Sequence, residues 1–264
     1  MGQLLNEFLP PIIKKYINSR KWKFEGNYKS WAEALNNCNG YDSFQVVKGM
    51  KERHEVWIKS YQELNKQTSY LDLISRNILS YFFYPIIELD KTIINVLDIG
   101  GAAGGHFSIV RDNLPTGKTL NWTINETQTA VNEFSKSFPQ SGLTFNSNIK
   151  DLYASNYDII YMSGTLQDLE SPYSIFESIK IISHKYLIIT RLPLIDSNND
   201  YLTIQHVPKS YYAGSYPSWF FSSQKFVSFL DANYRIIQKW EIESESVVLN
   251  GVEVFYKGYL LKLK

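Results

Sequence analysis

The chain has 264 residues, and its 27 Lys and Arg against 26 Asp and Glu leave a formal net charge of +1. This balance provides no basic excess for binding nucleic acid, and the single cysteine, Cys38, excludes an internal disulfide framework or a thiolate metal cluster. The 44% hydrophobic content can bury one large core, and no apolar run reaches the roughly 18 residues that a membrane-spanning helix needs.

Residues 1–90 are expected to form a helical extension that serves as a lid over the rest of the chain. Residues 4–17 have apolar side chains at helical spacing, interrupted by two prolines, and they lack the pattern of a signal peptide. Ser30 followed by Glu33 is a capping-box signature that predicts the start of a helix. A longer helical pattern runs over residues 43–84 and is expected to end near the proline that follows.

Short apolar runs alternate with amphipathic segments from residue 93 onward, which is the pattern of a parallel sheet with helices on both faces. The Asn250–Gly251 pair between the last two runs predicts a hairpin, so the sheet should end in antiparallel strands. We therefore expect a Rossmann-like α/β domain over residues 91–264, with a mostly parallel seven-stranded sheet. The expected strands are 93–99, 120–126, 143–147, 157–164, 186–192, 235–243 and 252–263, and the expected helices are 106–114, 127–138, 172–183 and 221–233.

A glycine-rich turn follows the first of these strands in the stretch NVLDIGGAAGGHF. Such small residues let the backbone turn tightly and approach a ligand closely. Dinucleotide-binding turns have glycines at i, i+2 and i+5, whereas methyltransferases typically have the pattern acid-x-G-x-G-x-G. Both patterns require a glycine at position 102, where this chain has Ala102, so the glycine spacing alone does not separate them. The second pattern also begins with an acid, which this chain supplies as Asp98, so we favour it. The glycines of the turn are Gly100, Gly101, Gly104 and Gly105.

Polar residues also follow the next three strands. Glu126 closes the second strand, where a carboxylate can accept hydrogen bonds from both hydroxyls of a ribose; the alternative is a solvated strand end. Asn148 is placed to meet an adenine edge, and the segment 163–166 is expected to close the pocket. These positions predict a nucleoside-type cofactor. The expected cofactor-binding residues are Asp98, Gly100, Gly101, Gly104, Glu126, Asn148, Ser163, Gly164 and Leu166.

Several motifs resemble a bacterial family of S-adenosylmethionine-dependent methyltransferases that is associated with surface-polysaccharide biosynthesis. The resemblance covers nearly the whole chain, and its most specific part is the aromatic motif over Thr203–Ser222. It implies a class I methyltransferase fold, S-adenosylmethionine as the cofactor and S-adenosylhomocysteine as the product. The other motifs are Pro10–Pro11, F-x-G-x-Y-x-S-W-x-E-A over 24–34, G-Y-D over 40–42, VLDIGGAAG over 96–104, LQDLESPY over 166–173 and R-L-P over 191–193.

Candidate catalytic residues lie after the fourth and fifth strands. Because histidine titrates near neutral pH, His206 ranks first as a general base, with a backbone-bonded loop histidine as the alternative. The family motif supports Gln205 as a site residue more strongly than it supports His206. Asp168 is a second candidate base, or else the N-cap of the next helix. Arg191 can hold a phosphoryl or carboxylate group, or else pair with an acid such as Asp168 or Asp196.

Aromatic side chains near Tyr212 suit the apolar faces of a sugar ring, although some of them are equally suited to packing on the core. We therefore predict an S-adenosylmethionine-dependent O-methyltransferase that acts on a saccharide-type acceptor or its phosphoryl or phosphoramidate substituent, in the bacterial cytoplasm near the inner face of the membrane. The expected partner is a small-molecule or oligosaccharide acceptor, and no metal site is predicted. The alternatives are an NAD(P)-dependent oxidoreductase and a non-catalytic protein that binds the cofactor within a biosynthetic assembly.

Overall fold

The structure is a computed structural model that describes residues 22–67, 73–208, 211–212 and 214–264. The amphipathic segment expected over residues 4–17 and the Pro10–Pro11 motif lie outside the described residues. Within the described part of the chain, no helix is long and apolar enough to cross a membrane.

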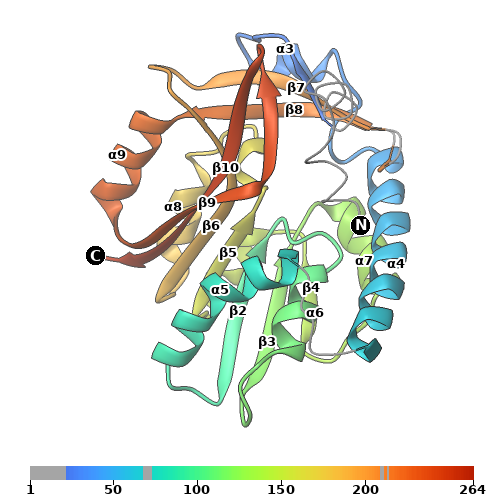
Figure 1. Cartoon of the computed structure of the whole chain (residues 1–264), viewed down its shortest axis with the longest axis vertical. Helices are drawn as coiled ribbons and strands as arrows, with labels where there is room; N and C mark the ends of the chain where they lie inside the picture. The colour runs from blue at the N-terminus through green and yellow to red at the C-terminus, as the bar shows by residue number, and fades with distance from the viewer. Residues whose placement is uncertain (1–21, 68–72, 209–210, 213) are drawn as a thin grey trace.

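Seven strands form the main sheet in the order β4-β3-β2-β5-β6-β10-β9 (Figure 1). The first five run parallel, and β10 pairs antiparallel with both β6 and β9. This confirms the predicted sheet with its closing hairpin. The strands are β2 (Ile93–Ile99), β3 (Thr119–Asn125), β4 (Leu143–Asn146), β5 (Ile159–Ser163), β6 (Tyr186–Ile195), β9 (Tyr234–Leu249) and β10 (Val252–Leu263).

Helices cover both faces of this sheet, because the central parallel strands are buried on both sides. Apolar residues of α5 and α6 pack on one face, and those of α8 and α9 pack on the other. Helix α4 packs against α7 beside the glycine-rich turn. The helices are α3 (Trp31–Leu35), α4 (Phe44–Gln67), α5 (Leu73–Glu88), α6 (Gly105–Asp112), α7 (Gln128–Ser137), α8 (Ile175–Ile181) and α9 (Ser223–Asn233), with 3-10 turns η1 (Ile149–Leu152) and η2 (Leu166–Asp168).

A second, smaller sheet lies beyond the carboxyl ends of the parallel strands, and we call it the accessory sheet (Figure 1). It consists of β1 (Lys23–Glu25), β7 (Tyr201–Val207) and β8 (Gly214–Ser222), and β8 joins the end of β6 through two parallel pairs. The sequence did not predict these strands, and β1 corrects the expectation of an entirely helical N-terminal region. Strand β8 contains Pro217, and because proline is rare within strands, the sequence of this segment did not indicate a strand.

The N-terminal region differs from the prediction in one further respect. The helical pattern over residues 43–84 forms two helices, and the second continues through Pro85 to Glu88. The capping box is confirmed, since Ser30 Oγ accepts a hydrogen bond from the backbone nitrogen of Glu33 at 3.2 Å. Because α5 supplies fully buried residues such as Phe82 to the main core, this part of the region is integral to the domain.

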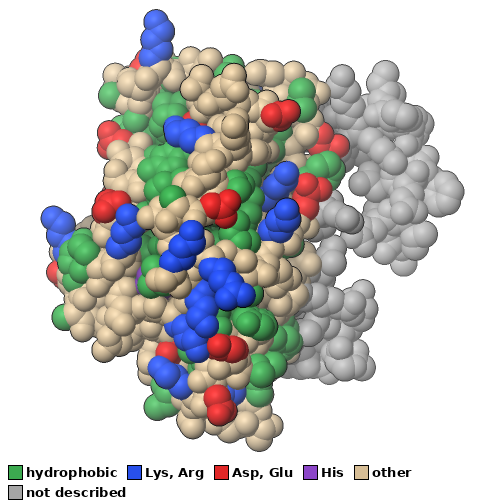
Figure 2. Space-filling model, turned by 90° about the vertical axis from the view of Figure 1, so that its left-hand side faces the viewer, with side chains coloured by type: hydrophobic (Ala, Val, Ile, Leu, Met, Phe, Trp, Pro, Cys, Tyr) green, Lys and Arg blue, Asp and Glu red, His purple; other side chains and the backbone are tan. Residues whose placement is uncertain are grey.

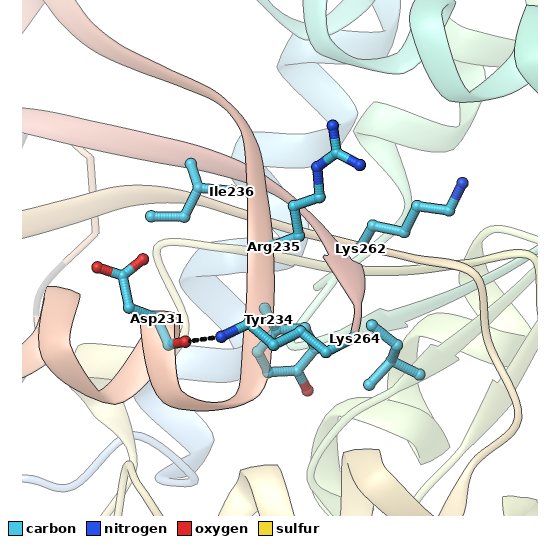
Figure 3. A pocket seen from close by; sticks show the side chains of 7 residues that line it. Asp231, Tyr234, Arg235, Ile236, Lys262 and Lys264 are labelled. Atoms are coloured by element: carbon cyan, nitrogen blue, oxygen red, sulfur yellow. Dashed lines mark hydrogen bonds between the residues drawn. The ribbon is translucent and has the colours of Figure 1, made fainter.

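Strand β9 is the edge of the main sheet among the described residues, since it pairs only with β10. Figure 2 shows this face, with Lys and Arg side chains gathered over its lower half. Arg235 and Lys239 are exposed on the edge strand, and such charges discourage pairing with another chain. A shallow depression of about 670 Å³ lies near Arg235 and Lys262, where Lys264 donates to the backbone oxygen of Asp231 (Figure 3). It lies beside the start of β6, at the opposite end of the sheet from the glycine-rich turn.

Candidate active site

A cleft of about 1880 Å³ opens at the carboxyl ends of β2, β3, β5 and β6. The glycine-rich turn lines one part of it, and α4, α5 and the accessory sheet line the rest. Ligands of open α/β sheets bind at this end of the strands, because the loops there converge. Among the lining residues are seven acids and two arginines: Asp42, Glu52, Asp98, Glu126, Asp168, Glu245 and Glu253, with Arg53 and Arg191.

The backbone of the glycine-rich turn is tightly constrained. A Cβ at Gly100 would lie 2.3 Å from Thr165, and one at Gly101 would lie 2.2 Å from Asp98. Ala102 has a φ of 47°, a conformation that side-chain-bearing residues rarely adopt. Its amide donates to Glu126 Oε1 at 3.2 Å, so the turn is tied directly to the acid at the end of the next strand.

Asp98 is buried at the floor of the cleft, with 1% of its surface exposed. Its Oδ2 accepts a hydrogen bond from Trp122 Nε1 at 3.0 Å. Burial raises the pKa of Asp98 to about 8, and the bond from Trp122 only partly opposes this effect. Because no ion pair with a described residue compensates it, this carboxyl group is suited to a cationic ligand.

Glu126 is also buried, and its oxygens have several donors. Oε2 accepts from the amide of Thr127 at 3.0 Å, and Oε1 accepts from the Tyr41 hydroxyl at 3.3 Å. Burial raises the pKa of Glu126, while the amides of Thr127 and Ala102 lower it. The contact with Tyr41 shows that the Glu126 carboxylate can accept a hydrogen bond from a hydroxyl group in the cleft.

Hydroxyl groups on the accessory sheet continue the cleft beyond Glu126. Gln205 Nε2 donates to the Tyr216 hydroxyl at 2.8 Å, and that hydroxyl lies 3.2 Å from the Tyr212 hydroxyl. Asp168 accepts from Ser218 Oγ at 3.0 Å, and burial raises the pKa of Asp168 to about 8. This end of the cleft therefore combines aromatic rings with a buried acid.

A chain of hydrogen bonds links the opposite side of the cleft to α5. The Tyr81 and Tyr161 hydroxyls lie 3.0 Å apart, and the Tyr161 hydroxyl lies 3.0 Å from His106 Nδ1. Burial lowers the pKa of His106 to about 4, so its ring is neutral at pH 7. His106 opens α6 directly after the glycine-rich turn and lines the cleft, so this neutral ring is available to a ligand.

Most residues predicted from the sequence line this one cleft. They are Asp98, Gly100, Gly101, Glu126, Ser163, Gly164, Asp168, Arg191, Gln205 and Tyr212.

Four predicted residues lie elsewhere. His206 alternates with Gln205 along β7, so it faces away from the cleft, and its Nε2 lies 2.8 Å from Glu25 Oε1. Asn148 caps η1, Leu166 is buried in the core, and Gly104 packs its backbone near Leu143. The structure therefore does not bring these four residues together with the others in the cleft.

The structure also differs from the expected structural roles of Asp168, as a helix N-cap, and of Arg191, as a partner of Asp168 or Asp196. Asp168 accepts from Ser218 on the accessory sheet and caps no helix, and Arg191 pairs with Glu245 rather than with Asp168 or Asp196. Sequence reasoning missed the contributions of Tyr41, Tyr81, Thr190 and Glu245 to the lining. Only Tyr41 carried a signal, as part of the G-Y-D motif.

No protein-family model matches the chain, and no curated protein matches its sequence. Among solved structures, the chain is similar to an S-adenosylmethionine-dependent methyltransferase from Clostridium acetobutylicum, with a TM-score of 0.50 and 12% identity over 80% of this chain and 98% of that one. It is also similar to 1,6-didemethyltoxoflavin-N1-methyltransferase from Burkholderia thailandensis, with a TM-score of 0.49 and 10% identity over 91% of this chain and 93% of that one. The first likeness, together with the strand order, shows that the fold is that of the class I methyltransferases.

Proposed function

We propose that the protein is an S-adenosylmethionine-dependent O-methyltransferase whose acceptor is a saccharide or a substituent of one. The observation that carries the proposal is the pair of buried acids, Asp98 and Glu126, at the ends of neighbouring strands and linked through the glycine-rich turn. This arrangement lies on the fold that the sequence predicted for such an enzyme.

The residues of the cleft fit this cofactor. Glu126 would hold the ribose hydroxyls, because its buried carboxylate already accepts from a hydroxyl. Asp98 would face the positively charged end of the cofactor, because no cationic side chain among the described residues pairs with its buried carboxyl group. When bound, S-adenosylmethionine supplies a methyl group activated by a positively charged sulfur. The protein would then act mainly by aligning the acceptor.

The acceptor would bind among the aromatic and hydroxyl groups beyond the cofactor. Tyr212 and Tyr216 offer ring faces and hydroxyls together, which suits the mixed surface of a sugar. A saccharide acceptor would place the enzyme in surface-polysaccharide biosynthesis, and a phosphoryl or phosphoramidate substituent is the other form of this proposal. Helix α4 and the loop carrying Tyr41 would serve as the lid, since both line the cleft.

Calorimetric titration with S-adenosylhomocysteine tests this proposal. We expect micromolar binding that is lost in Asp98→Ala and Glu126→Gln and retained in the control Asp231→Ala, which alters an exposed acid at the far end of the sheet. Binding of NAD in place of S-adenosylhomocysteine would instead support an oxidoreductase. Binding without methyl transfer to any saccharide would support the non-catalytic alternative.

A further inference from the structure

Strand β6 carries a bulge where it lines the cleft. Its pairing with β10 shifts from Leu192↔Lys257 to Ile189↔Tyr259, so Thr190 and Arg191 together lie opposite a single residue. Arg191 has a φ of 58°, in the left-handed region that favours glycine. Bulges next to active sites re-aim side chains, and a strained backbone of this kind persists where the surrounding structure enforces it. The bulge is therefore a candidate substrate contact.

Three buried polar atoms belong to this bulge and to the neighbouring strand β5. All three are enclosed, and Thr190 Oγ1 and Arg191 Nε have no hydrogen-bond partner among the described residues, whereas Ser163 Oγ interacts with the Tyr161 hydroxyl. Ser163 and Thr190 are register partners on adjacent parallel strands, so their side chains lie on the same face of the sheet. All three residues line the cleft. Since buried polar groups are normally hydrogen-bonded, these atoms indicate a place for a polar ligand group.

The charge of Arg191 is already compensated. Its Nη2 lies 2.8 Å from Glu245 Oε2, and its guanidinium lies 5.7 Å from the centre of the Tyr256 ring. The second arginine of the cleft, Arg53, stacks over the Tyr211 ring at 3.7 Å. Even with Asp98 and Asp168 protonated, the other acids that line the cleft outnumber its two arginines, so a phosphoryl or carboxylate group would meet more negative than positive charge.

We propose that Ser163, Thr190 and Arg191 form the polar part of the acceptor subsite, in the same cleft as the ring faces of Tyr212 and Tyr216, and that this subsite selects an uncharged, hydroxyl-rich ring over a phosphoryl- or carboxylate-bearing one. This inference rests on the proposed methyltransferase function and narrows its acceptor class. Arg191 Nε donates to a ligand oxygen, and the Ser163 and Thr190 hydroxyls exchange hydrogen bonds with ligand hydroxyls. Glu245 sets the selectivity, because it neutralises the guanidinium. Ser163, which the sequence placed beside the cofactor, contacts the acceptor instead.

The binding test uses the full chain saturated with S-adenosylhomocysteine. Neutral probes are the methyl glycosides of glucose, galactose, mannose and N-acetylglucosamine, and charged probes are galactose 6-phosphate and galacturonate, with binding followed by saturation-transfer NMR. We expect at least one neutral probe to bind more tightly than both charged ones. Thr190→Val and Ser163→Ala should each weaken that binding about threefold to tenfold, as the loss of one hydrogen bond does. Both variants should keep their affinity for S-adenosylhomocysteine, and Thr144→Val, on the exposed edge strand β4, should change neither affinity.

A second variant tests the selectivity. Glu245→Gln leaves the Arg191 charge uncompensated, so we expect affinity for galactose 6-phosphate to rise about tenfold or more. The inference is overturned if a charged probe binds the unaltered protein best, if no neutral probe binds, or if Thr190→Val has no effect on the neutral probe. Failure of S-adenosylhomocysteine to bind would overturn the proposed function instead, and repeating the probe titrations without it separates the two outcomes.

Discussion

Tyr41 donates a hydrogen bond to Glu126 Oε1 across 3.3 Å, so the loop before α4 contacts the acid that we assign to the ribose. The Tyr41 ring also packs edge-on against Tyr216, with ring centres 5.3 Å apart. Tyr41 thus joins Glu126, at the end of β3, to the accessory sheet. A ribose hydroxyl that binds Glu126 competes with this contact.

We predict that Tyr41→Phe binds S-adenosylhomocysteine about twofold to tenfold more tightly, because the competing hydroxyl is removed while the ring remains. Calorimetric titration checks this prediction. The matched control is Tyr173→Phe, which removes another tyrosine hydroxyl that donates to a carboxylate, that of Asp200, away from the cleft. Weaker binding by the Tyr41 variant alone would show that the hydroxyl supports the ligand and does not compete with it.

Ligand affinity should depend on the ionisation of Asp98. Burial raises the pKa of this carboxyl group to about 8, so it is mostly protonated at pH 7 in the free protein. A cationic ligand group favours the carboxylate, and binding should therefore release a proton. We predict that affinity for S-adenosylhomocysteine rises from pH 6 to pH 8 and then levels off. Titrations in two buffers with different ionisation enthalpies measure the released proton, and this release should fall toward zero once the pH passes the folded pKa of about 8.

The same raised pKa affects stability. Between the unfolded value of about 4 and the folded value of about 8, the folded state binds more protons at Asp98 than the unfolded state does. This contribution to the free energy of unfolding is fully present below pH 4 and is lost as the pH rises to 8. Urea denaturation of Asp98→Asn should therefore show a smaller loss of stability between pH 5 and pH 8. An unchanged pH profile would contradict the assignment.

Trp122 should stabilise the fold partly through its bond to Asp98. Trp122→Phe keeps a buried ring but leaves the carboxyl group without its donor at 3.0 Å. We predict a loss of about 1–3 kcal/mol in the free energy of unfolding. In the background of Asp98→Ala the same substitution should cost less, because the unsatisfied acceptor is gone. A double-mutant cycle by chemical denaturation measures the difference, and strict additivity would show that the bond contributes nothing.

Residues of this site were predictable from the sequence where they follow a recognisable strand. Asp98 and Glu126 lie at the ends of strands whose apolar runs are visible in the sequence, and neighbouring parallel strands end at the same edge of the sheet, so the two acids were expected to lie close together. Gln205 and His206 could not be separated without the register of β7, because a one-residue shift exchanges the two faces of a strand. The Arg191–Glu245 pair depends on a bulge in β6 and on the extension of β9 beyond the expected end at residue 243, and neither has a local signal.

Two buried histidines should make the protein sensitive to mild acid. Burial lowers the pKa of His106 to about 4, and it lowers the pKa of His54 to about 4 as well. Between an unfolded pKa of about 6.5 and these folded values, the unfolded state binds more protons, so stability present above pH 6.5 is lost as the pH falls toward 4.

We predict that His106→Asn loses less stability than the unaltered protein between pH 7 and pH 5, as measured by urea midpoints. His206→Asn is the control, because that side chain is paired with Glu25 outside the cleft. NMR titration of the His106 ring provides the direct check, since it should show no protonation above pH 5, and a midpoint near 6.5 would contradict the buried relay through Tyr161.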